Sequence, residues 1–175
     1  MDKTFVSILE TQGSKSLNIE DRRFSNEDIF EIFFDCCFFH KINFINCFFE
    51  DSECLGVNFN YCLFENCIFK NTIIRKSELT DCVFKKCQFL NCALSPRAEF
   101  YRTIFQNSQF FNTDFSFSTL SNCEFKMINF SQIVAYSTTI SNPKVQKTTF
   151  NGLEFEEVRP MKILFSELDS FPKEI

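Results

Sequence analysis

The sequence has little glycine and histidine and no tryptophan: 3 Gly, one His and no Trp occur in 175 residues. Three glycines leave no Gly-rich loop that would cradle a phosphate group. The single His40 gives no paired imidazoles for a metal ion. A net charge of −5 lacks the positive excess with which nucleic-acid binders neutralise phosphates. No run approaches the roughly 20 apolar residues of a membrane span, and the N-terminus leads into no long apolar stretch, so we expect no secretory signal.

Phenylalanine and cysteine are abundant instead. The chain has 27 Phe and 10 Cys, and apolar residues make up 45% of it. This composition excludes intrinsic disorder, and the length fits one domain. Because no export signal is expected, we predict reduced thiols and a cytoplasmic location. Free Cys behaves as a small buried hydrophobe.

A period of five residues runs through most of the chain. From Phe24 to Leu94, every fifth residue is apolar; after one slip, the beat resumes at Phe100 and continues to Phe155. The 27 beats include 18 Phe. Neither the 3.6-residue period of a helix nor the two-residue period of a strand produces this pattern. Internal repetition of this kind is typical of a solenoid, in which each unit is stabilised by its stacked neighbours.

A second beat of mostly small residues lies two positions before each apolar beat and contains eight of the ten cysteines. Asn recurs at nine positions, each two residues after a central apolar beat: Asn26, Asn46, Asn66, Asn71, Asn91, Asn107, Asn112, Asn122 and Asn142. With so few glycines, we expect Asn to supply the positive φ that tight corners need.

The pattern resembles the pentapeptide repeat family, with Phe in place of the central Leu. Cys62–Asn66 reads Cys-Leu-Phe-Glu-Asn, and the next five residues read Cys-Ile-Phe-Lys-Asn. The resemblance implies an all-β fold: a right-handed quadrilateral β-helix with four repeats per coil. The central residue and the residue two positions before it would point inwards. We assign residues 1–23 to an N-terminal cap, 24–157 to a β-helix of about seven coils, and 158–175 to a C-terminal cap or dimerisation helix.

If four repeats make a coil, residues twenty apart stack in columns. The central columns are then ladders of Phe rings, which gain a few tenths to ~1.5 kcal/mol per pair beyond area burial. Their predicted core comprises Phe44, Phe64, Phe84, Phe49, Phe69, Phe89, Phe110 and Phe130.

Cysteines of the second beat also stack, as in the column Cys47, Cys67 and Cys87. We interpret them as buried structural thiols. A metal or redox site is the alternative, but their spacing follows the repeat and not ligand geometry. We predict no metal and no cofactor.

The slip at 95–99 adds one residue and contains Pro96. We interpret it as a bulge or corner loop; the alternative is a recognition element with Arg97 and Glu99 as contacts.

Coil ends need covering, and residues 4–8 predict a short capping strand. The C-terminal segment predicts a short helix, because Pro160 suits a first helical turn and apolar residues follow at helical spacing. The helix would cap the last coil or form a homodimer through Met161, Leu164, Phe165 and Leu168.

Two outward features are candidates for partner binding. An apolar row is predicted at Ile45, Leu63, Val83 and Ile104, and the off-beat rings are Phe33, Phe38, Phe48 and Phe111. Rows of exposed apolar groups mark interfaces. A polar face with carboxylates could imitate duplex DNA, and its candidate contacts are Glu78, Asp81, Glu99 and Arg97.

Within the family, residues 19–29 resemble the opening of the quinolone-resistance (Qnr) members, with Asp-Arg, Arg-Phe, a hydroxyl residue and a following Glu. Those Qnr members that carry two projecting loops differ from this chain, which has one slip. The resemblance implies protection of a bacterial type II topoisomerase, DNA gyrase or topoisomerase IV, from poisons by DNA mimicry, without direct nucleic-acid binding.

The alternative function is a protein-interaction scaffold with another partner. The sequence shows no nucleophile elbow and no metal-spaced Cys/His set, so we predict a binding module and not an enzyme.

Overall fold

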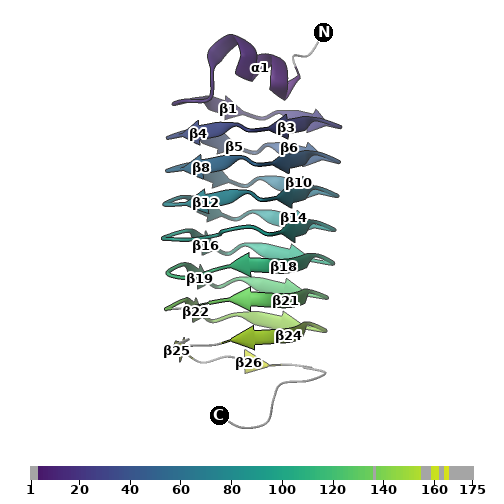
Figure 1. The fold of residues 1–175 in the computed structure, drawn as a ribbon, viewed down its shortest axis with the longest axis vertical. Helices are drawn as coiled ribbons and strands as arrows, with labels where there is room; N and C mark the ends of the chain where they lie inside the picture. Colours follow the sequence, from purple (N-terminus) through teal and green to yellow (C-terminus); the bar gives the residue numbers. More distant parts are fainter. Residues whose placement is uncertain (1–3, 136, 155–158, 162–163, 166–175) are drawn as a thin grey trace.

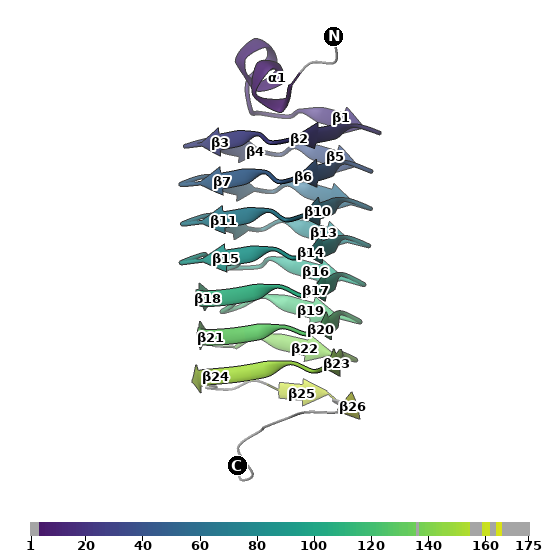
Figure 2. The same ribbon diagram turned by 90° about the vertical axis from the view of Figure 1, so that its right-hand side faces the viewer.

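Each five-residue repeat forms a three-residue strand followed by a corner, and four repeats close one coil. The structure, a computed structural model, describes residues 4–135, 137–154, 159–161 and 164–165. The coils stack into a four-sided tower whose strands all pair in parallel, with residues 4–12 at one end and residues 164–165 at the other (Figures 1 and 2). Each side of the tower is named below after its first strand.

The four faces are columns of strands one coil apart. The β1 face contains β1 (Asn18–Glu20), β5 (Phe38–His40), β9 (Asn58–Asn60), β13 (Glu78–Thr80), β16 (Glu99–Tyr101), β19 (Thr119–Ser121), β22 (Thr139–Ser141) and β25 (Arg159–Met161). The β2 face contains β2 (Arg23–Ser25), β6 (Asn43–Ile45), β10 (Leu63–Glu65), β14 (Val83–Lys85), β17 (Ile104–Gln106), β20 (Glu124–Lys126), β23 (Lys144–Gln146) and β26 (Leu164–Phe165). The β3 face contains β3 (Asp28–Phe30), β7 (Phe48–Glu50), β11 (Ile68–Lys70), β15 (Gln88–Leu90), β18 (Gln109–Asp114), β21 (Asn129–Val134) and β24 (Thr149–Glu154). The β4 face contains β4 (Phe33–Asp35), β8 (Glu53–Leu55) and β12 (Ile73–Arg75), and it continues through Ala93 into the second halves of β18, β21 and β24.

The register confirms the period of twenty. Phe64 lies opposite Phe44 and Phe84 on the neighbouring strands. Across the slip the offset between neighbouring strands becomes 21 residues on every face, as where Phe84 lies opposite Phe105. The added residue lies between Leu94 and Arg97: the Pro96 carbonyl accepts from the Lys76 N–H at 3.0 Å, so the main-chain ladder continues through the corner. The slip therefore absorbs an extra residue without opening the coil.

The corners depend on left-handed backbone. The residue two positions after nearly every central residue has a φ near +50°, and at the slip Arg97, three positions after Leu94, takes this conformation. The N–H of the corner residue donates to a carbonyl of the next coil, as from Asn46 to Glu65 at 2.9 Å. The expectation that Asn takes this conformation is confirmed for all nine predicted Asn residues. It is incomplete, because Asp, Lys, Glu and even Phe117 take it too. Stacking of coils overrides the local cost for these residues.

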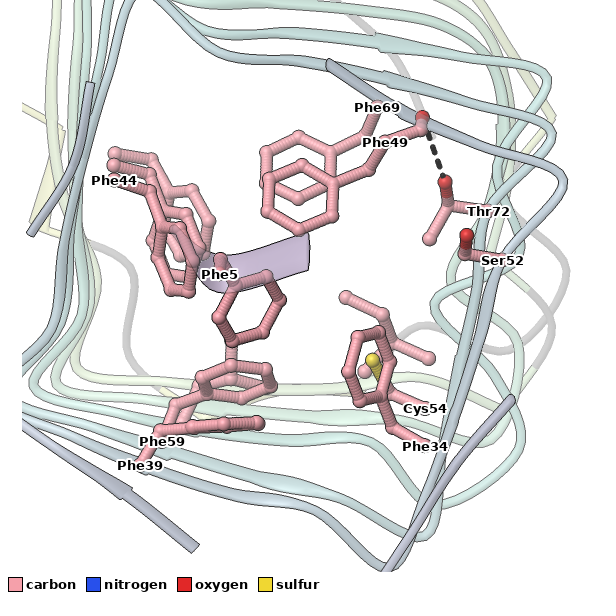
Figure 3. A pocket seen from close by; sticks show the side chains of 14 residues that line it. Phe5, Phe34, Phe39, Phe44, Phe49, Ser52, Cys54, Phe59, Phe69 and Thr72 are labelled. Atoms are coloured by element: carbon pink, nitrogen blue, oxygen red, sulfur yellow. Dashed lines mark hydrogen bonds between the residues drawn. The ribbon is translucent and has the colours of Figure 1, made fainter. Parts of the chain in front are cut away.

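The Phe ladders form the core. Phe64 stacks on Phe44 and Phe84 with ring centroids 5.2 and 4.7 Å apart, and rings of adjacent columns meet edge to face. All eight Phe residues assigned to the core from the sequence are buried. The interior is almost filled: a cavity of about 20 Å³ remains near the N-terminal end, where Cys54 stands in the column of Phe34 (Figure 3).

The N-terminal cap is a helix, so the predicted strand at residues 4–8 is wrong. Helix α1 (Phe5–Gln12) begins at the N-cap Thr4, whose hydroxyl accepts from the Ser7 N–H, and ends at Gly13 with φ +75°. Its apolar residues follow the i, i+3, i+4 spacing of a helix face. They plug the first coil, where the buried ring of Phe5 lies 4.9 Å from that of Phe24. In the described part of the chain no helix is long and apolar enough to cross a membrane.

Glu27 attaches this helix to the β-helix. It occupies an inward position that small residues fill in later coils, and only 8% of it is exposed. Its carboxylate accepts from the Phe5 N–H at 2.9 Å and from the Val6 N–H at 3.5 Å. These N–H groups are among the unpaired donors of a helix N-terminus, where negative charge is favourable. The buried carboxylate is thereby satisfied.

The C-terminal helix is also wrong where the structure describes that segment. Residues 159–161 and 164–165 are the strands β25 and β26, which pair with β22 and β23. Pro160 lies opposite Ile140, and Phe165 opposite Val145. Main-chain pairing to the last coil thus extends the period of five through Pro160 and Phe165. The helical spacing of Met161, Leu164 and Phe165 had predicted a helix instead. Leu168 lies outside the described residues. The first coil likewise begins before the expected residue 24, because Ile19 in β1 stacks on Phe39.

We expect Phe84→Ala to lower the free energy of unfolding by about 3–5 kcal/mol, because a fully buried ring is removed from a ladder that cannot collapse around it. Phe111→Ala is the matched control, since this ring is 43% exposed. Denaturant titration of both variants measures the difference. Equal losses would contradict the ladder as the source of stability.

We expect Glu27→Ala to destabilise the protein by about 1–2 kcal/mol, because two N–H groups of α1 lose their acceptor. The neighbouring exposed Asp28→Ala should change stability by less than about 0.5 kcal/mol. Chemical denaturation followed by circular dichroism tests both. A neutral Glu27 variant would show that α1 is held by its apolar residues alone.

Candidate functional site

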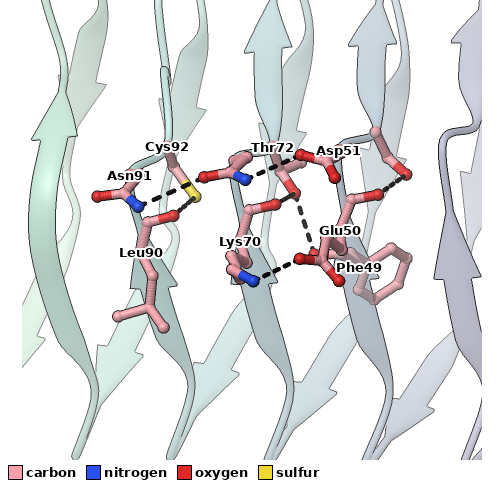
Figure 4. A network of polar contacts seen from close by, with 10 residues as sticks. Phe49, Glu50, Asp51, Lys70, Thr72, Leu90, Asn91 and Cys92 are labelled. Carbon is pink, nitrogen blue, oxygen red and sulfur yellow. Dashed lines mark hydrogen bonds and ion pairs between the residues drawn. The ribbon is translucent and has the colours of Figure 1, made fainter.

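The stacked cysteines are the candidates for a metal or redox site inside the tower. Their thiols donate to the carbonyl of a central residue in the preceding coil: Cys67 to Phe44 at 3.3 Å and Cys87 to Phe64 at 3.3 Å. Hydroxyls at equivalent positions do the same, as from Thr72 to Phe49 at 3.2 Å (Figure 4). The position therefore selects small side chains that donate one hydrogen bond to a buried carbonyl.

These thiols have the properties of structural groups. Burial raises the pKa of Cys92 to about 11 and that of Cys123 to about 12, so both stay protonated near neutral pH. Thiolates are the form that binds metals and attacks disulfides. Among the residues that the structure describes, all ten cysteines are free thiols and no group of His, Cys, Asp and Glu is arranged to hold a metal ion.

Of the four predicted partner-binding residues, the structure brings Glu78 and Glu99 together. They lie directly opposite each other on β13 and β16. Asp81 lies at the next corner, where Arg102 donates to it through Nε at 2.6 Å and lowers its pKa. The Arg102 guanidinium also lies 4.3 Å from the ring centroid of Tyr101. Arg97 is at the opposite corner of the β1 face, so it stands apart from Asp81.

Two carboxylates of the second coil are neutralised by cations of the third coil. Glu50 binds Lys70, and Glu53 binds Arg75. Figure 4 shows the pair of Glu50 and Lys70. On the same side of the tower, Asn71 donates to Asp51 at 2.9 Å. Exposed ion pairs of this kind contribute little stability. Their effect on the surface is to remove net negative charge from these coils.

Charge is separated along the axis of the tower. Residues 18–57, the first two coils, contain three Lys and Arg against nine acidic residues. These acidic residues are Glu20, Asp21, Glu27, Asp28, Glu31, Asp35, Glu50, Asp51 and Glu53. Residues 58–149 contain ten Lys and Arg against six acidic residues. The first two coils thus have a net charge of −6 and the following ones a net charge of +4, which the overall value of −5 conceals.

The aromatic rings that are exposed on the surface differ in part from the predicted set. Phe33 and Phe111 are exposed as predicted, whereas Phe38 stacks on His40 and Phe48 packs against Phe30. Phe30, which was not singled out, is 48% exposed. Its signal was present, because the residue directly after a central residue points outwards. The apolar row is real for Leu63, Val83 and Ile104, which are in register on β10, β14 and β17; Ile45 lies on the neighbouring row.

One shallow surface groove of about 680 Å³ lies over the corner between the β1 and β2 faces in the later coils. Its lining includes Tyr101, Arg102, Asn122 and Asn142, with Glu124 as its single carboxylate. General acid–base catalysis needs a positioned pair of titratable groups. The groove offers no carboxylate pair and no histidine.

A family model described as a pentapeptide repeat region matches residues 82–159. The chain resembles a trypsin-treated variant of QnrB1, described as a plasmid-mediated fluoroquinolone resistance protein, at a TM-score of 0.51 and 16% identity, over 77% of this chain and 73% of that one. It also resembles the pentapeptide repeat protein Rfr23 of the cyanobacterium Cyanothece 51142, at a TM-score of 0.30 and 11% identity, over 76% and 95% of the two chains. No curated protein matches the sequence. The QnrB1 likeness concerns the fold, and it confirms the predicted right-handed quadrilateral β-helix.

We expect one fast-reacting thiol in the native protein, Cys36, because it is exposed while the other nine cysteines are buried. Its reaction rate should increase with pH as the thiolate forms. This increase should lie at a higher pH than for an ordinary thiol, because a hydrogen bond to Asp35 raises the pKa of Cys36. A colorimetric thiol reagent with and without denaturant measures this, and Cys36→Ser is the control that should abolish the native reaction. Several thiols reacting at one rate in the native protein would contradict the inward placement.

Proposed function

We propose that this pentapeptide repeat protein is a non-catalytic binding module that protects a bacterial type II DNA topoisomerase from poisons by occupying a DNA-binding surface of the enzyme. Its fold resembles that of QnrB1, described as a fluoroquinolone resistance protein, and this likeness supports the choice of a topoisomerase as the target. In this proposal the protein acts in the cytoplasm. It forms a homodimer through the segment 158–175.

The observation that carries the proposal is the charge density of the first two coils. Stacked strands are about 4.8 Å apart, so the net charge of −6 in residues 18–57 is spread over about 10 Å of the axis. Glu50 and Glu53 are paired with Lys70 and Arg75 of the next coil, and Glu27 is buried against α1. The remaining net charge that faces solvent is −3, about one negative charge per 3 Å of axis, which is roughly half the density of duplex DNA at one per ~1.7 Å. The later coils carry net positive charge, so the negative charge density is confined to the N-terminal end of the tower.

The geometry of these carboxylates suits electrostatic recognition of a basic surface. Asp28 follows the buried Glu27 at the start of β3, and Glu31 is at the next corner; both side chains are exposed. Asp21 is exposed at the corner between β1 and β2. Because the strands and corners are fixed by the main-chain ladder, the charges need little ordering on binding, and charges arranged in advance steer association and improve affinity.

A second candidate function, a scaffold for a partner other than topoisomerase, is favoured by the positive later coils and by the row Leu63, Val83 and Ile104. A DNA-binding surface of a topoisomerase is basic and offers nothing to complement further lysines. The two functions place the contact at different parts of the tower.

We expect the triple variant Asp21→Asn, Asp28→Asn and Glu31→Gln to lose most of the protection in a gyrase supercoiling assay with a fluoroquinolone. Three net charges are removed from exposed positions, and each such charge contributes up to about 1 kcal/mol. Glu78→Gln with Glu99→Gln is the matched variant on the β1 face, and we expect it to retain more protection. Unfolding transitions should be unchanged in both.

The wild-type protein decides the function itself. If it neither restores supercoiling nor binds gyrase at micromolar concentration, the proposal is wrong. If it protects but only the Glu78 and Glu99 variant fails, the enzyme is right and the contact lies on the β1 face.

A further inference from the structure

The β2 face carries a net positive charge, whereas the rest of the tower is net negative. Its outward and corner residues within 18–149, taken with the exposed Arg22, form what we call the basic face. It contains seven cations and two carboxylates, a net charge of +5, whereas the remaining faces over the same residues have a net charge of −7. The cations are Arg22, Arg23, Lys85, Lys86, Lys126, Lys144 and Lys147.

Most of these cations have no internal counterion. Lys85 binds Glu65 at 2.8 Å. The pKa of Glu65 is lowered by Lys85 and further by Lys86 and Arg23, so its carboxylate lies in a positive field. Among the described residues, Lys86, Lys126, Lys144 and Lys147 form no ion pair. The face therefore presents uncompensated charge to a partner.

An apolar row runs beside the lysines on the same face. Leu63, Val83 and Ile104 are stacked in register on consecutive coils, and each side chain is partly exposed. A nucleic-acid backbone offers no apolar surface to such a row, and none of the outward described residues of the basic face is aromatic, so base stacking has no platform here. Combined charge and apolarity favour a protein segment over a nucleic acid.

The spacing of the rungs selects the form of that segment. Coils repeat every ~4.8 Å, a helix turn rises 5.4 Å, and two residues of a strand rise about 6.8 Å. Over the two intervals from Leu63 to Ile104, a helix lying along the axis drifts from the rungs by about 1 Å and a strand by about 4 Å. The distance from β10 to β23 is four intervals, about 19 Å, which corresponds to about 13 helical residues.

We propose that the basic face binds an acidic amphipathic helix of a partner protein. Apolar residues of the helix at i, i+4 and i+7 lie on Leu63, Val83 and Ile104, and carboxylates on one flank face Lys86, Lys126 and Lys147. Apolar burial supplies affinity, and the lysines fix the orientation of the helix. This surface is separate from the acidic coils assigned to the topoisomerase, so the tower has two binding surfaces of opposite sign.

The test uses the full-length protein and a fluorescent helical peptide of about 18 residues, with Leu at i, i+4 and i+7 and Glu on one flank. We expect saturable binding by anisotropy that weakens with salt. Lys86→Gln, Lys126→Gln and Lys147→Gln together should weaken it about tenfold or more, and Val83→Thr, which exchanges one methyl for a hydroxyl, about threefold or more. Lys76→Gln with Arg97→Gln, which removes two cations at a corner away from this face, is the control and should change affinity by less than about twofold.

Two further probes decide between occupants. The same peptide with Gln in place of Glu should bind about tenfold more weakly or not at all. A duplex DNA of about 20 base pairs should bind more weakly than the Glu peptide. If the Glu peptide does not bind at about 100 μM, which corresponds to a binding free energy of about −5.5 kcal/mol, the proposal is overturned. Tighter binding of the duplex together with no effect of Val83→Thr would overturn it in favour of a polyanion site.

Discussion

The structure depends on the stacking of one coil on the next through main-chain hydrogen bonds at every strand and corner. A single coil has no partner for these groups and cannot bury its own central residues, so stability is shared between neighbours. This constraint explains why non-glycine residues adopt a positive φ at nearly every corner, including Lys86 and Phe117. It also explains the small hydrogen-bonding residue two positions before each central one, because its thiol or hydroxyl donates to the carbonyl of a central residue in the preceding coil.

Because stacking fixes the backbone, the outward residues are nearly independent of the fold. Three positions in five face outwards, and they can change charge or polarity without disturbing the Phe ladders. The protein uses this freedom to separate charge twice. Along the axis, the first two coils are negative and the later coils positive; around the axis, the β2 face is positive and the remainder negative. Net charge of the whole chain describes neither distribution, and it is the local density that determines what each surface attracts.

The period of five was enough to predict the core and the columns, because each inward beat is read directly from the sequence. It was also enough to predict that Asn would occupy corners. It failed at both ends. At the N-terminus, Phe5, Ile8 and Leu9 have helical spacing that a short window also allows for a strand, and the signal that a helix docks there is Glu27 at an inward beat. At the C-terminus, Pro160 and Phe165 continue the beat, but the helical spacing of their neighbours was followed instead. For the surface, the sequence indicated Glu78, Asp81, Glu99 and Arg97 as one set of contacts. The structure brings only Glu78 and Glu99 opposite each other, and the partner of Asp81 is Arg102, 21 positions away, which only the stacked coils bring near.

The central claim is that the first two coils occupy a surface that DNA would otherwise occupy on a type II topoisomerase. Competition measures this directly: labelled protein is bound to gyrase, and unlabelled duplex DNA is added while anisotropy is recorded. The account predicts that duplex DNA displaces the protein and that the affinity of the protein decreases as salt is raised, as expected for an electrostatic contact. Simultaneous binding of DNA and protein, with an affinity insensitive to salt, would contradict it.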